Sequence, residues 1–419
     1  MAHFGVLSYK GTGHLNPLIT LSQGLIARGH GVTFFLPPEL ESRIRLHGID
    51  FFPMDLSEIA PARHRKRPSS RSKPEWAKDM RARLQRIGRE IRVYMRVYAA
   101  AIRKANVDVL IMGEITLAGP TVAQLLDIPY VVISTSIPHN FGWDAPRSLL
   151  PQRTWREALQ AKIFEVSIFH MKGPVRRILD RYRSQAGLGP VSGMGTAFPE
   201  LAHITQWPQC LSKPRQELPD RFFYTGPFVS GDSRSQIDFP WHKLNCQPVV
   251  YASLGTTLKA DPNVYHCIAA ACVGLDVQLV ITLGGRRNPE DFAELPGNPL
   301  VVENAPQLDL LKRAEIVITH AGPNTALETL LQGKPMLCMP IALDQPAVAD
   351  HLQCLGVAEV LSAQQRSIEE IRAALLKLMS EARYREAARE IQAQLQSLEG
   401  VTQAAILIEN ALSNHRQPA

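Results

Sequence analysis

The sequence lacks the features that direct a chain to or across a membrane. No stretch of about 18 uninterrupted apolar residues occurs, so we expect no membrane-spanning helix. The first residues form an apolar strand pattern with Lys10 and His14 close behind it, which leaves no room for the apolar core of a secretory signal. We therefore expect a cytoplasmic protein.

Cysteine is scarce, and its spacing is not that of a metal site. The chain has six cysteines, none of them in a Cys-x-x-Cys pair, which argues against structural zinc. Several lie in apolar runs, and we interpret all six as reduced thiols of a cytosolic protein.

The charge balance is basic but does not identify a partner. A net charge of +7 and a pI near 9.1 are compatible with phosphate-bearing ligands, nucleic acid or an anionic membrane. The most basic run, from Pro61 to Lys73, contains no aromatic residues and belongs to no recognisable module. We interpret it as a charged loop, and we expect no nucleic acid as a partner.

The length and the patterning predict two α/β domains. A chain of 419 residues exceeds one ordinary core. Strand patterns alternate with helix patterns in both halves, which predicts two Rossmann-like, doubly wound parallel sheets facing a central cleft. We place the domains at residues 1–225 and 226–385. Residues 386–419 are expected to form helices that pack back on the first domain.

One segment of the second half has the pattern of a phosphate site. An apolar strand, Ile316 to Thr319, leads into a small-residue turn, and Pro323 suits the first position of a helix. Free backbone N–H groups and the helix dipole would then converge on one point, which favours an anion. His320, Asn324, Thr325 and Glu328 surround that point with donors and acceptors. The pattern predicts a site for a nucleoside diphosphate that carries a polar group.

Two further turns are candidate ligand loops. The first contains Gly11 and Gly13 but has Asn16 where a dinucleotide fingerprint requires glycine, which disfavours a nicotinamide or flavin cofactor. His14 enters a helix there, and the helix dipole favours its neutral form, which can accept a proton. The alternative is a histidine that only hydrogen-bonds the turn. The second loop, Ser253-Leu-Gly255-Thr256, is either a phosphate contact or a simple strand exit.

Together these motifs resemble those of the family 1 UDP-glycosyltransferases. The matching elements cover nearly the whole chain, and Asp344 to Ala349 is similar to a run in bacterial carotenoid glucosyltransferases and other microbial members. The matching motifs are Gly13-His14-x-x-Pro17, Ser253-x-Gly255-Thr256, Pro306-Gln307, Thr319-His320-x-Gly322 with Asn324 and Glu328, and Pro340-x-x-x-Asp344-Gln345.

The resemblance implies a fold of the GT-B type and an inverting hexosyltransferase. The donor would be a UDP-sugar, with glucose indicated by Gln345. The acceptor would be a small lipophilic alcohol of the carotenoid, sterol, flavonoid or macrolide type. No tightly bound cofactor is implied. No Asp-x-Asp motif occurs, so we expect no metal at the diphosphate.

The resemblance also assigns roles to individual residues. His14 matches the general base, and Glu114 stands where the family has an aspartate that holds the base. Asp108, at the start of the same strand, is the alternative. His320 matches a residue that contacts the diphosphate, and Glu328 matches the carboxylate that binds the ribose hydroxyls. Asp344 and Gln345 match the pair that binds the hydroxyls of the sugar. The other expected donor-site residues are Gly13, Ser253, Gly255, Thr256, Asn304, Gln307, Gly322, Asn324 and Thr325. Asn304 replaces a tryptophan that stacks on uracil in many relatives, which leaves the choice between uridine and thymidine open.

Other functions and partners remain alternatives. A nucleotide-sugar epimerase, or a non-catalytic nucleotide-sugar-binding protein, could share the fold. The apolar segment Ile163 to Met171 favours a lipophilic acceptor. The Arg-rich helix expected from Glu75 to Lys104 has apolar residues between its basic ones, so it is either a solvated face or a contact with the inner face of a membrane. We expect a monomer or a weak dimer.

Overall fold

The computed structural model describes most of the chain. It covers residues 1–58, 73–137, 175–190, 201–212, 221–256, 260–285, 287–342 and 344–416. Residues 61–72 of the basic loop predicted from Pro61 to Lys73 lie outside the described residues, as does the apolar segment of residues 163–171, and Lys73 begins a helix. All six cysteines are described and free, and three of them, Cys267, Cys272 and Cys338, are buried.

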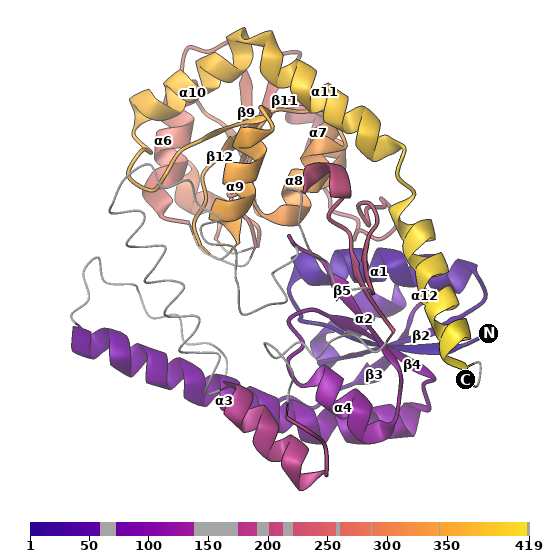
Figure 1. The fold of residues 1–419 in the computed structure, drawn as a ribbon. Coiled ribbons are helices and arrows are strands. Elements are labelled where there is room, and N and C mark those ends of the chain that lie inside the picture. The colour runs from indigo at the N-terminus through magenta and orange to yellow at the C-terminus, as the bar shows by residue number, and fades with distance from the viewer. Residues whose placement is uncertain are drawn as a thin grey trace.

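The first half forms a seven-stranded parallel sheet, shown in indigo to magenta in Figure 1. The strand order is β3-β2-β1-β4-β5-β6-β7, and the central strands are apolar and buried on both faces, as a sheet covered by helices requires. The strands are β1 (His3–Leu7), β2 (Gly31–Leu36), β3 (Asp50–Pro53), β4 (Val109–Gly113), β5 (Tyr130–Ser134), β6 (Ala202–Thr205) and β7 (Phe222–Tyr224). The helices of this half include α1 (Thr12–Ala27), α2 (Glu41–Arg45), α3 (Lys73–Ala105) and α4 (Gly119–Leu126).

The second half forms a six-stranded parallel sheet with the order β10-β9-β8-β11-β12-β13. Its strands are β8 (Val249–Ser253), β9 (Gln278–Thr282), β10 (Leu300–Val302), β11 (Ala314–Thr319), β12 (Met336–Cys338) and β13 (Ala358–Val360). Its helices are α6 (Pro262–Cys272), α7 (Gln307–Arg313), α8 (Pro323–Leu330), α9 (Gln345–Cys354), α10 (Ile368–Ser380) and α11 (Ala382–Gln396). Two parallel α/β domains are therefore confirmed.

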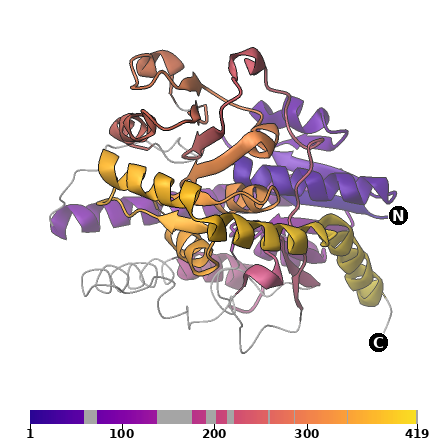
Figure 2. The ribbon, with the colours of Figure 1, turned by 90° about the horizontal axis from the view of Figure 1, so that it is seen from above.

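The last helix, α12 (Gly400–Arg416), leaves the second domain and lies against the first. Ala404, Ala405 and Ile408 are fully buried in the hydrophobic core that also contains β1, β2 and α1. Glu409 accepts hydrogen bonds from the guanidinium of Arg28 at 2.8 and 2.6 Å. Figure 2 shows the helices α10, α11 and α12 following one another across the molecule, and both chain termini lie on the same side.

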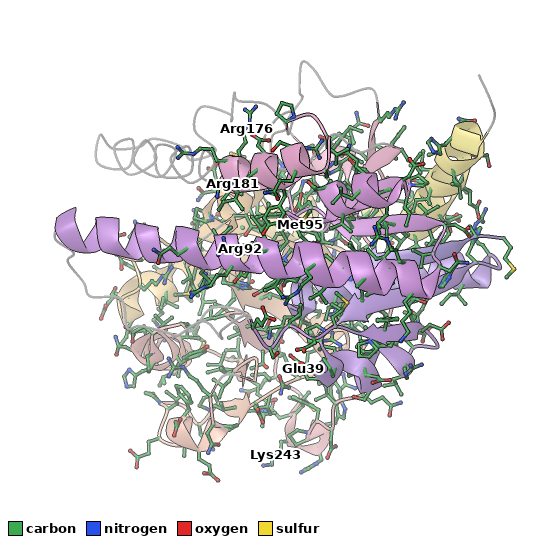
Figure 3. The ribbon with its side chains drawn as sticks, turned by 90° about the horizontal axis from the view of Figure 1, so that it is seen from below. Glu39, Arg92, Met95, Arg176, Arg181 and Lys243 are labelled. Carbon is green, nitrogen blue, oxygen red and sulfur yellow. The ribbon has the colours of Figure 1, made fainter. Side chains whose placement is uncertain are left out.

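A long helix, α3, carries a basic face on the first domain. It packs against the helix of residues 175–185 through Ile91, Met95 and Leu179. Figure 3 shows α3 crossing the molecule with Arg92 on it and Arg176 and Arg181 on the neighbouring helix. Among the side chains that the structure describes on the two helices, the exposed arginines are Arg89, Arg92, Arg96, Arg103, Arg177 and Arg181.

Candidate active site

His14 stands in the first turn of α1, at the carboxyl edge of the first sheet. The strand β1 ends at Leu7, and Gly11 accepts the backbone N–H of His14 at 2.9 Å. The imidazole Nδ1 lies 2.9 Å from the hydroxyl oxygen of Thr135, and Tyr9 packs edge-on against the ring. Burial lowers the pKa of His14 to about 4, because the charged form loses its hydration. The imidazole is therefore neutral at pH 7.

The structure corrects the expected partner of His14. Glu114 follows β4, as predicted, and is buried, but its carboxylate oxygens accept hydrogen bonds from Ser134 at 2.5 Å and Ser136 at 2.8 Å. The group at Nδ1 of His14 is instead the hydroxyl of Thr135, between those two serines. Glu114 therefore contacts the two serines on either side of Thr135, and Thr135 contacts His14.

His320 lies in a narrow space between two glycines of the second domain. A Cβ atom on Gly255 would lie 2.5 Å from Nε2 of His320, and one on Gly322 would lie 2.7 Å from the same atom. Gly255 also has a φ of +88°, which glycine adopts at little cost. The ring of His320 therefore leaves no space for a side chain at Gly255 or at Gly322.

The environment of His320 suits a neutral imidazole beside an anionic ligand. Burial lowers the pKa of His320 to about 4, although a hydrogen bond with the backbone of Ser253 acts to raise it. Its Nδ1 is buried without a hydrogen-bond partner among the described residues. A buried polar atom of this kind is costly unless it is paired.

The start of α8 offers backbone donors at the same edge. The first intrahelical hydrogen bond runs from the N–H of Ala326 to the carbonyl of Gly322, and no side chain caps the helix. The amides of Asn324 and Thr325 precede that bond, so they are among the donors that a helix start leaves for other partners. Ala321 has a φ of +61° immediately before the helix. Strain of this kind concentrates at ligand-binding turns.

Asn324 connects the two domains. Its side-chain nitrogen donates to the carbonyl of Gly13 at 2.7 Å, and its oxygen accepts from Gln206 at 2.8 Å. Gln206 follows β6 and also donates to the carbonyl of Thr135 at 2.7 Å. The start of α8, predicted for phosphate binding, therefore contacts the turn that carries His14.

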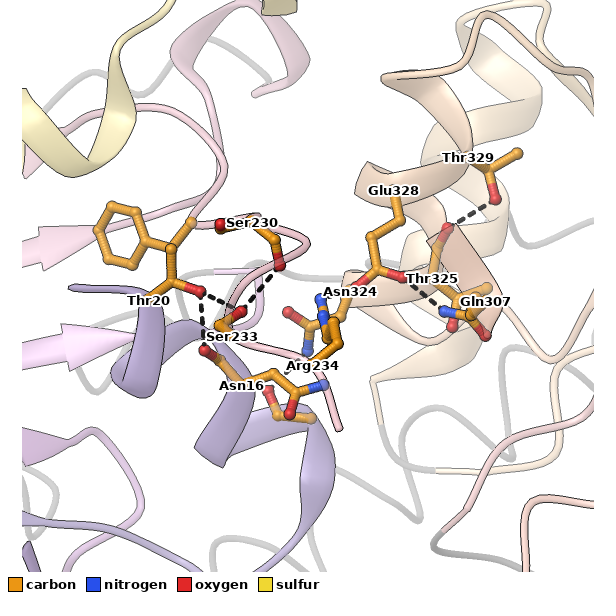
Figure 4. A network of polar contacts seen from close by, with 12 residues as sticks. Asn16, Thr20, Ser230, Ser233, Arg234, Gln307, Asn324, Thr325, Glu328 and Thr329 are labelled. Carbon is orange, nitrogen blue, oxygen red and sulfur yellow. Dashed lines mark hydrogen bonds and ion pairs between the residues drawn. The ribbon is translucent and has the colours of Figure 1, made fainter. Parts of the chain in front are cut away.

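Glu328 is buried in a network that includes the segment between the domains (Figure 4). One carboxylate oxygen accepts from Arg234 at 2.5 Å, and the other accepts from Gln307 at 2.5 Å. Next to Arg234, the hydroxyl of Ser233 accepts from Thr20 of α1 at 2.7 Å. Glu328 and Gln307 were predicted as donor-site residues; Arg234 was not.

The remaining predicted residues lie on neighbouring loops of the second domain. β8, β11 and β12 end side by side, because Ser253 pairs with Thr319 and Thr319 pairs with Cys338. Thr256 and Asn304 are exposed, and Asn304 lies beside the Gly284–Gly285 turn. Asp344 is the N-cap of α9. Gln345 accepts the N–H groups of Ile341 and Ala342 through its oxygen, which leaves its amide NH₂ for a ligand.

Among the described residues, no three histidine, cysteine, aspartate or glutamate side chains are grouped so that they could hold a metal ion. None of the helices in the described part of the chain is long and apolar enough to cross a bilayer.

The chain is similar to several known proteins. The model of the family described as UDP-glucoronosyl and UDP-glucosyl transferase matches residues 242–398. A zeaxanthin glucosyltransferase of Pantoea ananas is 26% identical over 421 residues, covering 98% of this chain and 96% of that protein.

Solved structures share the whole fold. The calicheamicin glycosyltransferase aligns with a TM-score of 0.77 at 21% identity, covering 100% of both chains. A spinosyn rhamnosyltransferase complexed with thymidine diphosphate aligns with a TM-score of 0.71 at 19% identity, covering 98% of this chain and 100% of that one. These neighbours have the GT-B fold.

Proposed function

We propose that the chain is a glycosyltransferase of the UDP-glucoronosyl and UDP-glucosyl transferase type that uses a nucleotide-sugar donor, and that it transfers glucose from UDP-glucose to a lipophilic alcohol with inversion. The observation that carries this proposal is the contact between the two halves of the cleft. Asn324 at the start of α8 donates to Gly13, next to His14. The donor cradle and the proposed base are thus held together.

In this mechanism His14 is the general base. Its neutral imidazole takes the proton of the acceptor hydroxyl through Nε2, because Nδ1 faces Thr135. The acceptor oxygen bonds to the anomeric carbon from the face opposite the diphosphate, and the bond to the diphosphate breaks with its electron pair on the leaving oxygen. Positioned proton transfer of this kind contributes about 10²–10⁴-fold to a rate.

The leaving diphosphate is stabilised by fixed donors. In this proposal the backbone amides of Asn324 and Thr325 and the neutral ring of His320 donate to the oxygens on which negative charge develops. Donors fixed before the reaction stabilise that charge without reorganisation. Glu328 and Gln307 receive the ribose and the base, and Asp344 with the NH₂ group of Gln345 binds the sugar hydroxyls.

The donor and acceptor are tested together. The purified protein is incubated with UDP-glucose or TDP-glucose and with zeaxanthin, a sterol, a flavonoid and a macrolide, and glucoside formation is measured. We expect transfer from UDP-glucose, and we expect UDP to raise the melting temperature. Conversion of UDP-glucose to another hexose without an acceptor would indicate an epimerase, and binding without turnover would indicate a non-catalytic protein. Absence of both binding and transfer would contradict the proposal.

The role of His14 has its own variant. His14→Ala should lower kcat by about 10²–10⁴-fold with little change in UDP affinity, because the base is lost and the donor cradle remains. His242→Ala removes an exposed histidine of the second domain and serves as the control. Full transfer activity in His14→Ala would remove His14 from the mechanism.

We also propose that the basic face of α3 contacts an anionic lipid bilayer. The exposed arginines of α3 and of residues 175–185 lie on two helices packed side by side. Arginine attracts anionic lipid headgroups by charge complementarity. Such a contact would bring the cleft to a membrane in which a lipophilic acceptor is dissolved.

A further inference from the structure

We propose that Thr135 is the positioning residue for His14, and that its hydroxyl takes the place at Nδ1 that a carboxylate occupies in a histidine–carboxylate pair. The inference rests on the proposed function, since it gives His14 the role of base. The contact that supports it is the 2.9 Å distance between Thr135 Oγ1 and His14 Nδ1. Thr135 is 1% exposed, so bulk water does not compete for that contact.

The segment from Ser134 to Ser136 is held at three points. Ser134 and Ser136 donate to the two oxygens of Glu114. The carbonyl of Thr135, between them, accepts from Gln206, which is fully buried. A residue whose neighbours and carbonyl are all fixed has little freedom to move its side chain away from the ring. Glu114 therefore acts on His14 through the two serines.

Ser134 is not a catalytic nucleophile, although its neighbours are those of one. Ser134 lies 2.7 Å from Nε2 of His203 as well as 2.5 Å from Glu114, which has the composition of a nucleophilic triad. Ser134 is 0% exposed and lies within β5, so no substrate reaches its hydroxyl. We assign these residues to the frame that holds Thr135.

A hydroxyl partner has a specific chemical consequence. When Thr135 accepts the Nδ1–H of His14, Nε2 keeps its lone pair and can receive the acceptor proton. Unlike a carboxylate, the hydroxyl carries no negative charge to stabilise the imidazolium that forms. The partner therefore orients the base without raising its basicity, which agrees with the low pKa of His14.

Removal of the hydroxyl tests the contact. Thr135→Val keeps the branched shape and should lower kcat on the order of tenfold with the donor KM unchanged, because one orienting hydrogen bond is lost. Thr135→Ser should restore the rate. The control is Thr33→Val, which removes a similar contact, 2.8 Å from His3 Nε2, at the amino ends of β1 and β2. A wild-type kcat in Thr135→Val, or an equal loss in Thr33→Val, would overturn the inference.

A carboxylate in place of the hydroxyl tests the same contact in the opposite direction. Thr135→Asp should shift the acid limb of the kcat/KM profile to higher pH, because a negative charge at Nδ1 favours the imidazolium. Glu114→Gln keeps a group that can accept from a serine, so it should lower kcat a few-fold without moving that limb. If Glu114→Gln moves the limb while Thr135→Val and Thr135→Asp leave the profile unchanged, Glu114 is the direct partner.

These outcomes are separable from those of the proposed function. If the wild type transfers no sugar, or if His14→Ala is fully active, the proposed function or its base fails first. If the wild type transfers sugar, His14→Ala is impaired and the Thr135 variants behave as wild type, only the positioning role fails.

Discussion

Gly255 and Gly29 share a left-handed backbone conformation but differ in their surroundings. Their φ angles are +88° and +87°, and a Cβ would meet the ring of His320 at Gly255 but nothing within 4 Å at Gly29. The strain of a side chain at such φ costs about 1–2 kcal/mol, and overpacking adds about 1–3 kcal/mol. The free energy of unfolding should therefore fall by the strain cost alone in Gly29→Ala, and by the strain and overpacking costs together in Gly255→Ala.

The two glycine variants also differ in donor binding. Gly255→Ala should displace His320 and weaken UDP binding in calorimetry, whereas Gly29→Ala should bind UDP as the wild type does. Urea unfolding gives the loss of stability in each variant, and the difference between the two losses is the cost of the clash with the ring of His320. Equal losses in the two variants, with unchanged UDP affinity in both, would show that the ring of His320 does not need the space above Gly255.

At the scale of residues, motifs predicted His14 and His320 but not their partners. The glycines and the strand-to-helix turns that mark these histidines are local in sequence. Thr135 is 121 residues from His14, Gln206 is 118 residues from Asn324, and Arg234 is 94 residues from Glu328. Such contacts are created by the packing of strands and domains, and no local pattern records them.

At the scale of elements, apolar patterning predicted the longer strands and helices. The predicted strand from Ile316 to Thr319 lies within β11, and the predicted helix from Glu75 to Lys104 lies within α3. The missed strands are β3, β6, β7 and β13, with three or four residues each. A segment that short carries too little periodicity to distinguish a strand from a loop, and its position is decided by pairing with neighbours.

The basic face of α3 allows a prediction at this scale. The wild type should sediment with vesicles of anionic lipid at about 0.1 M salt and be released at about 1 M, where the screening length falls to about 3 Å. Arg92→Gln with Arg96→Gln should weaken binding by about tenfold or more, since each arginine near the surface contributes about 1 kcal/mol.

The control for α3 is a matched pair on α11. Arg385 and Arg389 are exposed and also four residues apart, and Arg385 pairs with Glu315 as Arg96 pairs with Glu58. Their replacement by glutamine changes the net charge equally but at another surface. If the α11 pair weakens sedimentation as much as the α3 pair, the attraction comes from net charge alone, and an unbound wild type would contradict a lipid contact.

At the scale of the whole molecule, the length and the strand–helix alternation predicted two domains. The contacts between them were not predicted, because they arise only when both domains are folded. Asn324 bonds to Gly13 and Gln206, and Ser233, next to Arg234, accepts a hydrogen bond from Thr20 of the first domain. The two domains are thus connected through residues of the candidate site itself.

Buried histidines in both domains predict how the stability of the whole molecule depends on pH. Burial lowers the pKa of His14 to about 4, of His203 to about 3 and of His320 to about 4. In the unfolded chain histidine titrates near 6.5, so between that pH and about 4 the unfolded state binds more protons than the folded state. The free energy of unfolding should therefore fall as the pH falls through this window.

The window from pH 6.5 to 5 isolates the histidines from the carboxylates. Ordinary Asp and Glu titrate near pH 4, and the ion pair with Arg28 lowers the pKa of Glu409 to about 2. Over that window each buried histidine should remove on the order of 1 kcal/mol of stability, measured by urea unfolding.

Because His320 lies in the second domain and the other two histidines lie in the first, the urea midpoints of both domains should move. His320→Gln should flatten only the dependence of the second domain, and the exposed His242→Gln should change neither. A stability that is constant or rises as the pH falls from 6.5 to 5 would mean that these imidazoles are protonated in the folded protein, and His14 could then not act as a base.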